Sequence, residues 1–148
     1  MIAIGDVTEL QDIADPRNAV SVVKGKLKFE WPSLMLFRSD NFACKKLTPE
    51  YIDNPVSKPQ TLEWCPEDRL GSLPEEWNHC VPYDDPGQAK IIHYTAGIPC
   101  WPETKECEHS AAWWEEFRHA NSTVEWKDLM ANSVHATPEV MGKLKATA

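Results

Sequence analysis

Residues 90–101 read Lys90-Ile91-Ile92-His93-Tyr94-Thr95-Ala96-Gly97-Ile98-Pro99-Cys100-Trp101 and carry the strongest structural signal in the chain. The apolar run that opens this segment, residues 90–94, predicts a buried strand with a histidine near its end. Gly97 permits backbone conformations closed to other residues, and the proline that follows stiffens the turn. We therefore expect a strand that passes directly into a tight loop closed by Trp101.

The histidine in this segment, His93, has two interpretations. A neutral imidazole at a strand end can bind Mn, Zn or Fe, or can transfer a proton. The alternative is a hydrogen-bonded core histidine, which is the usual state of an isolated histidine in a strand. The glycine-containing loop behind His93 favours the functional interpretation, because it allows a ligand to approach the backbone closely.

Length and charge limit the classes of protein to consider. A chain of 148 residues fits one domain and is long enough to bury a core. The formal net charge of −8 argues against nucleic acid as a partner, because phosphate binding requires clustered Lys and Arg. An anionic ligand held through a metal ion stays compatible with an acidic protein, because the charge of the ion dominates such a site.

The sequence gives no sign of a membrane segment or of secretion. No apolar run approaches the roughly 18 residues that indicate a transmembrane segment. The first residues lack the basic start and apolar stretch of a signal peptide. Five cysteines, an odd number without framework spacing, fit a reducing compartment. We expect a cytoplasmic protein.

Local patterns predict several short elements. Residues 6–15 begin with a capping aspartate and end at a proline, as a short helix does. Residues 19–23 and 33–37 are strand-like, and the continuous apolar run of the second predicts a buried central strand. A further helix begins at Thr48-Pro49. Beyond residue 102 the apolar spacing is helical, and it continues through 124–130 into the tail.

A zinc site is the obvious alternative for Cys100, Cys107 and His109 near the end of the loop. Zinc ligands occur mostly in pairs two to four residues apart. The Cys-x6-Cys-x-His spacing does not match that pattern, so we do not expect structural zinc there.

Seven residues in two segments share an order and spacing with a known family: Leu73, Pro74, Trp77, Asn78, His93, Gly97 and Trp101. The chain resembles the C-terminal half of a GT-A-fold glycosyltransferase of family 8, the glycogenin and lipopolysaccharide-galactosyltransferase type. The resemblance implies an α/β fold, namely the C-terminal portion of a GT-A mixed sheet with flanking helices, without the N-terminal nucleotide-binding half. It implies one partial domain over residues 1–148, with the sheet and active-site loops in 1–102 and C-terminal helices in 103–148.

The same resemblance implies transfer of a sugar from a nucleotide-diphosphate donor to an unknown acceptor. It makes His93 a ligand of Mn2+ or Mg2+, beside an Asp-x-Asp pair, and it places Gly97 and Trp101 against the diphosphate. A divalent ion suits this chemistry because it neutralises the charge that develops on the departing diphosphate.

The resemblance also makes three residues candidates for binding the donor or acceptor sugar. These are Asn78, Gln60 and Glu63, and the last two are assigned by position in the chain alone.

The chain departs from the family at its start. No Asp-x-Asp occurs at any position, although residues 1–10 are similar to the segment that directly follows this pair. We expect either that Met1 is an internal methionine of a longer enzyme, or that the chain is a short paralogue that has lost catalysis. In both cases we expect little or no transferase activity from the chain alone. The alternative function is a non-catalytic accessory or binding module with the same fold.

Overall fold

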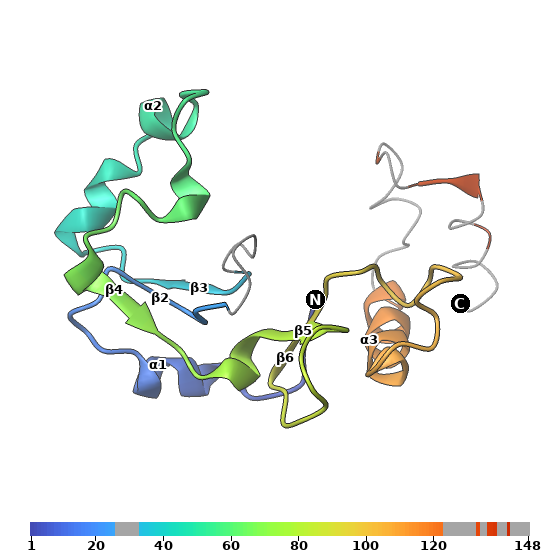
Figure 1. Ribbon diagram of the computed structural model, residues 1–148. Helices are drawn as coiled ribbons and strands as arrows, with labels where there is room; N and C mark the ends of the chain where they lie inside the picture. Colours follow the sequence, from blue (N-terminus) through green and yellow to red (C-terminus); the bar gives the residue numbers. More distant parts are fainter. Residues whose placement is uncertain (26–32, 123–132, 134–135, 139–141, 143–148) are drawn as a thin grey trace. The chain divides into compact units, whose positions relative to one another are not determined.

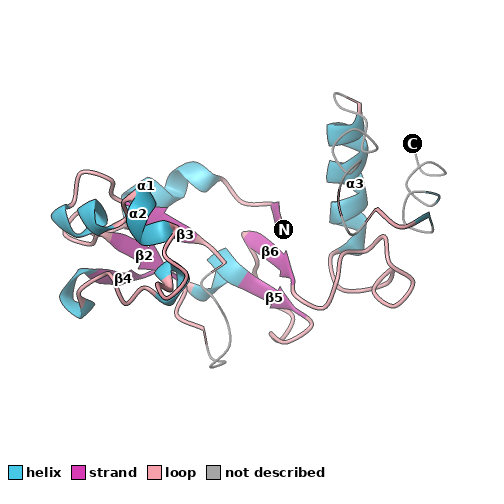
Figure 2. Cartoon of the chain, turned by 90° about the horizontal axis from the view of Figure 1, so that it is seen from above, coloured by secondary structure: helices cyan, strands magenta, loops and turns pink. Residues whose placement is uncertain are grey.

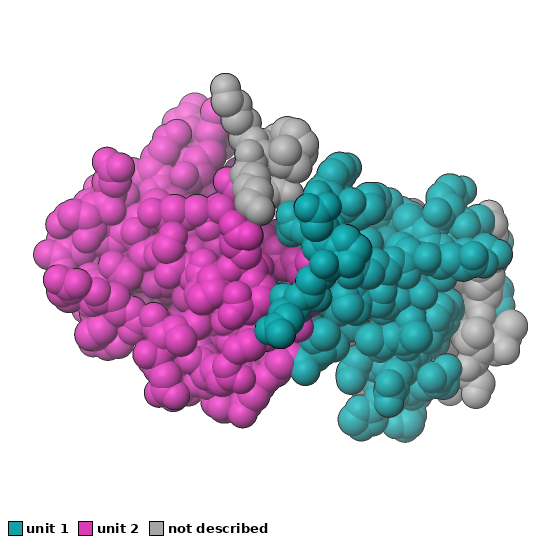
Figure 3. All heavy atoms as spheres, turned by 60° about the horizontal axis from the view of Figure 1, so that its bottom comes forward, with its two compact units in different colours: residues 1–4, 80–88, 92–148 teal, residues 5–79, 89–91 magenta. Residues whose placement is uncertain are grey.

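The structure is a computed structural model, and it describes residues 1–25, 33–122, 133, 136–138 and 142. The chain divides into two compact units, which Figure 3 draws in teal and magenta. Unit 1 comprises residues 1–4, 80–88 and 92–148, and unit 2 comprises residues 5–79 and 89–91.

Unit 2 contains a three-stranded mixed sheet in the order β3-β2-β4. The middle strand β2, Val20–Val22, pairs antiparallel with β3, Met35–Phe37, and parallel with β4, Leu70–Ser72. All three residues of β2 are buried, whereas β3 is half-buried and ends at an exposed phenylalanine. The three strands lie side by side in Figure 1.

A strand is confirmed within residues 33–37, but the expectation that it is buried and central is wrong. This segment forms β3, but β3 lies at the edge of its sheet. The central place belongs to β2, which the sequence also predicted as a strand. β3 pairs with β2 along one side. Its sequence is apolar because Met35 packs against a core cluster, although the strand lies at the sheet edge.

The helices of unit 2 are short and begin at capping side chains. The Asp6 carboxylate accepts a hydrogen bond from the Thr8 amide, and a 3-10 turn over Val7–Glu9 then leads into α1, Leu10–Ile13. The Thr48 hydroxyl caps α2, Pro49–Ile52, in the same way. Both helix starts confirm the sequence prediction. Further 3-10 turns cover Phe42–Lys46, Pro59–Thr61, Glu67–Arg69 and Glu75–Asn78, and Figure 2 shows their place among the strands.

Trp77 lies at the centre of an apolar cluster of unit 2. Its side chain is only 1% exposed and lies in a cluster with Leu10, Leu73 and Ile91. The Lys90 ammonium lies 5.0 Å from the centre of the Trp77 ring, a cation–π distance. The aromatic residue of the 73–78 segment therefore has a structural role in this unit.

Unit 1 contains the second three-stranded sheet, in the order β1-β6-β5. The strands are β1, Ile2–Ala3, β5, His79–Val81, and β6, Ile91–Tyr94. The strand predicted at 90–94 is confirmed as β6, the middle strand of its sheet.

The helix α3, Ser110–Asn121, confirms the helical spacing predicted beyond residue 102. Trp113 and Phe117 are buried and stack with ring centres 5.3 Å apart, while Trp114 meets Trp113 edge-on. The predicted helix over 124–130 lies outside the described residues.

These elements give a small mixed α/β architecture with two three-stranded sheets and few helices. Within the described part of the chain, no helix is both long and apolar enough to cross a bilayer.

Burial of Ile92 in β6 predicts a large stability effect. Ile92 is 0% exposed, so Ile92→Ala should lower the free energy of unfolding by about 2–5 kcal/mol, through lost burial and the cavity left behind. Urea unfolding followed by circular dichroism measures the change. Val56 is 81% exposed, so the matched Val56→Ala variant should change stability by less than about 0.5 kcal/mol. Equal effects of the two variants would contradict the burial argument.

Candidate functional site

The end of β6 is fixed by hydrogen bonds to the neighbouring strand. The Thr95 amide donates to the Val81 carbonyl at 3.1 Å and to the His93 carbonyl at 3.0 Å. The Thr95 hydroxyl donates to the same Val81 carbonyl. The chain therefore leaves the sheet directly after Tyr94. His93 is the second-last residue of β6, just before the loop.

Gly97 and Trp101 pack directly against each other in this loop. Gly97 has a φ of +130°, and a Cβ atom built on it would lie 2.5 Å from Cε3 of Trp101. The Trp101 amide donates to the Ile98 carbonyl at 3.1 Å, and the Thr104 hydroxyl donates to that carbonyl at 2.7 Å. The indole thus covers one face of the glycine, and both residues hold the loop together.

His93 is half-buried and lies beside a cysteine of the adjacent strand. Its Nδ1 atom is 3.9 Å from Sγ of Cys80, a residue of β5. The Cys80 backbone amide donates to the Asp84 carboxylate at 2.8 Å, which fixes the turn after β5. The Cys80 thiol and the His93 imidazole are therefore neighbours on adjacent strands.

A cavity of about 440 Å³ lies next to the loop in unit 1. This volume is within the usual range for small-molecule sites. Its walls come from the residues after β5, from the loop around Gly97, and from the turns over residues 102–107. Lys105 lines it and is ion-paired with Glu106 at 3.1 Å, and Glu103 and the Cys107 thiol also face it.

Burial alters the acidity of two groups near the cavity. It raises the pKa of the Cys107 thiol above the ordinary value for cysteine. It also raises the pKa of the Tyr94 hydroxyl, which donates to the His109 carbonyl at 2.9 Å. Both groups are therefore protonated at neutral pH, and neither acts as a ready nucleophile or base.

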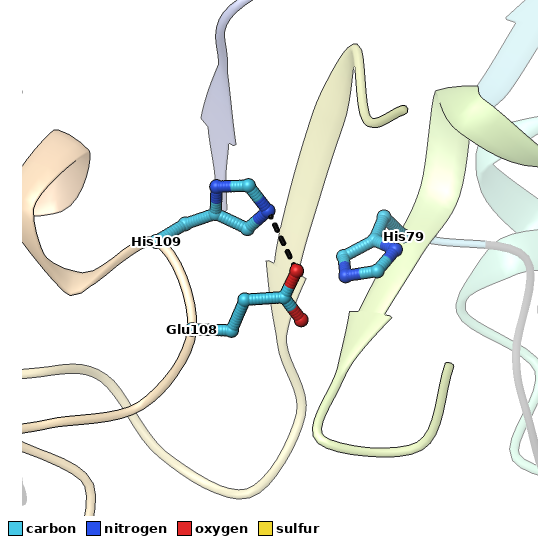
Figure 4. Close-up of side chains that lie close together, drawn as sticks. All are labelled: His79, Glu108 and His109. Atoms are coloured by element: carbon cyan, nitrogen blue, oxygen red, sulfur yellow. Dashed lines mark ion pairs between the residues drawn. The ribbon is translucent and has the colours of Figure 1, made fainter. Parts of the chain in front are cut away.

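Glu108 and His109 form an ion pair immediately before α3. The Glu108 carboxylate lies 3.1 Å from Nε2 of His109, as Figure 4 shows. His109 adopts a positive φ of 58°, which turns the chain into the helix. Carboxylate and imidazole both suit Zn or Mn, but two groups are fewer than the three that hold catalytic zinc. His79, also drawn in Figure 4, belongs to unit 2 and is buried.

The residues that the sequence assigned to a metal and a diphosphate are thus found in one unit. His93, Gly97 and Trp101 all belong to unit 1, at the end of β6 and in its loop. Within the described residues, His93 belongs to no group of three His, Cys, Asp or Glu side chains close enough to share an ion. His93 alone does not make a metal site, because divalent ions need several protein ligands.

The residues that the sequence assigned to a sugar lie in unit 2. Gln60 is half-buried in a 3-10 turn, Glu63 is exposed, and Asn78 is buried at the end of another 3-10 turn. None of the three lines the cavity beside the loop.

Sequence reasoning missed Cys80 and the cavity walls at 102–107. Cys80 is buried, with 3% of its surface exposed. Its position beside His93 depends on the pairing of β5 with β6, which nothing in the local sequence signals.

The tight contact at Gly97 predicts a specific loss of stability. Gly97→Ala should destabilise the fold by about 1–3 kcal/mol, because the new methyl group meets the Trp101 ring and the backbone is strained. Chemical unfolding monitored by tryptophan fluorescence measures it. Gly87 provides the matched control, since a Cβ there would meet its nearest atom only at 3.7 Å. A Gly97→Ala variant as stable as Gly87→Ala would contradict the packing described.

The raised pKa of Cys107 predicts slow, pH-dependent alkylation. A thiol with a raised pKa is less ionised at neutral pH, and the thiolate is the form that reacts. Iodoacetamide should therefore modify Cys107 more slowly than it modifies a free cysteine. The rate should keep rising above about pH 8.5, the ordinary cysteine pKa. Mass spectrometry of the modified peptide gives the rate at each pH. A plateau below that pH would show that burial does not control this thiol.

The comparisons with known proteins change one expectation. No protein-family model matches this chain, and no solved structure matches it. The chain is 26% identical over 142 residues to "Protein CDI" of Arabidopsis thaliana, an alignment that covers 80% of this chain and 55% of that protein. The chain therefore spans about half the length of the curated relative it matches. The assignment to glycosyltransferase family 8 is wrong, because neither a family model nor a structural neighbour of that kind is found.

Proposed function

We propose that this chain takes part in the transfer of a sugar from a nucleotide-diphosphate donor, with Mn2+ or Mg2+ as cofactor. The observation that carries the proposal is the position of His93. It is a half-buried imidazole at the end of the middle strand β6, and it directly precedes the loop of Gly97 and Trp101 beside a cavity of about 440 Å³.

The charges around this cavity support a role for a metal ion. Among the described residues that line the cavity, Lys105 is the basic one, and Glu103 and Glu106 are acidic. Protein cations there cannot balance a diphosphate, because the two carboxylates outnumber the lysine. A bound divalent ion would supply the missing positive charge and stabilise the departing diphosphate. His93 would be one ligand of that ion, and the carboxylate ligands would come from residues outside this chain.

The match to only part of the relative is compatible with a site whose ligands come partly from outside this chain. The chain matches about half of the Arabidopsis protein, so a longer polypeptide or a partner is a reasonable source for the remaining ligands and the nucleotide site. We also propose a reducing, cytoplasmic location, which fits the odd number of five cysteines without framework spacing.

Binding of Mn2+ tests the proposal directly. Mn2+ is paramagnetic, so in 15N-labelled protein it should broaden the resonances of His93 and residues 97–101, more strongly when UDP or GDP is present. His93→Ala should remove this broadening. The control is His119→Ala, an exposed histidine of α3, which should leave it unchanged. Broadening that is confined to surface carboxylates, or that survives His93→Ala, would refute the ligand role.

A second candidate function is a ligand-binding module without catalysis. The observation in its favour is the cavity itself, whose walls of mixed polar and apolar character can hold a small molecule without an ion. Saturable binding of UDP at residues 97 and 102–107, equally strong with EDTA and with Mn2+, would favour this function over metal-dependent transfer.

A further inference from the structure

The Cys80 thiol and the His93 imidazole form a pair of metal-ligating side chains that lies wholly within unit 1. Sγ of Cys80 is 3.9 Å from Nδ1 of His93. The function proposed above uses the imidazole and gives the thiol no role. Thiolate sulfur and imidazole nitrogen are ligands for soft and borderline metal ions.

Two adjacent strands hold this pair in place. Cys80 is the middle residue of β5, and His93 is on β6, which lies next to β5 in the sheet. The Cys80 carbonyl accepts hydrogen bonds from the amides of Tyr83 and Asp84, at 2.8 and 2.9 Å. The Cys80 amide donates to the Asp84 carboxylate. The sheet and the turn after β5 therefore support both ligand atoms, and such support favours a precise ligand geometry.

The distance between the two atoms suits one ion that bridges them. Bonds from a metal to thiolate sulfur and to imidazole nitrogen are about 2.3 and 2.0 Å long. At a separation of 3.9 Å, such an ion would have a sulfur–metal–nitrogen angle of about 130°. That angle is wider than the tetrahedral angle of zinc sites, and the shorter bonds of a two-coordinate ion would open it further. The geometry therefore favours an ion with few ligands.

The number of ligands leads to the same conclusion. Across the part of the chain that the structure describes, neither Cys80 nor His93 belongs to a group of three His, Cys, Asp or Glu side chains close enough to share an ion. Zinc sites use at least three protein ligands. Cu+ binds thiolate readily and forms stable complexes with only two ligands. The pair therefore suits Cu+ better than it suits a divalent ion.

Charge also separates Cu+ from the divalent ions. Cys80 is only 3% exposed, and His93 is half-buried. A thiolate, a neutral imidazole and Cu+ together carry no net charge. Zn2+ or Mn2+ on the same two ligands would leave one positive charge on the complex. The neutral complex loses less hydration energy on burial, so this position favours Cu+.

We infer that Cys80 and His93 bind one Cu+ ion, with Sγ and Nδ1 as its two ligands. The thiol proton passes to solvent when the ion binds, and the oxidation state of copper does not change. The inference goes beyond the proposed sugar transfer and does not depend on it, because Cys80 has no part in that reaction.

Competition with the chromogenic chelator bicinchoninate tests the inference on the full chain. Cu+ is added under anaerobic, reducing conditions, and absorbance gives the fraction that the protein holds. Cys80→Ser and His93→Ala should each bind the first equivalent of Cu+ at least about tenfold more weakly than the parent, since loss of even an outer-shell partner costs that much. Cys65→Ser, at a buried thiol of unit 2, is the matched control and should leave the affinity unchanged. Circular dichroism checks that each variant is folded.

Ag+, which has the same filled d shell as Cu+, identifies the ligands on the unmodified chain. Both natural silver isotopes have nuclear spin one-half, so a nitrogen bonded to Ag+ shows a split 15N resonance. In protein labelled with 15N-histidine, one equivalent of Ag+ should split the Nδ1 resonance of His93. The exposed His119 should show no splitting. X-ray absorption at the copper edge should show one sulfur and one nitrogen ligand.

Three results would each overturn the inference. The first is a Cu+ affinity that is the same in the parent as in Cys80→Ser or in His93→Ala. The second is a His93 Nδ1 resonance that Ag+ does not split. The third is a copper site with only sulfur ligands, or with three or more ligands. The Mn2+ experiment described above can fail separately, because Cys80→Ser removes a copper ligand and keeps the imidazole.

Discussion

The sheet of unit 1 depends on the burial of Ile92 in the middle strand. Ile92 is fully enclosed, and side chains alternate between the two faces along a strand. His93 must then point to the other face, where it meets Cys80. The loop that follows is positioned by the same strand, since Thr95 bonds back to β5 immediately after the last paired residue. Packing thus determines where the imidazole and its loop lie.

Glycine has a comparable role in the two units. Gly97 allows an indole to lie against the backbone, and Gly71 allows two polar side chains to do so. In unit 1 the result is a closed loop beside a cavity, and in unit 2 it is the close packing of Asn18 and Ser21 against β4. The absence of a Cβ atom at these two positions therefore allows neighbouring side chains to pack closely against the backbone.

Local features of the structure were predictable from the sequence, and long-range ones were not. The caps at Asp6 and Thr48 bond to amides two or three residues away, so their signals are complete within a short window. The strand β6 was predictable because its apolar run is continuous. The central position of β2 and the contact between Cys80 and His93 follow from strand order, which local sequence does not encode. The contact of Ser21 with Gly71 was unpredictable for the same reason.

The hydrogen bond from Tyr94 to the His109 carbonyl has a consequence for the dynamics of unit 1. It ties the last residue of β6 to the residue that starts α3, although a long loop separates them. Fraying of the first turn of α3 would release the strand end that carries the imidazole. The strand end and the helix start therefore form one cooperative unit, and their amide protons should exchange with solvent through a shared opening event.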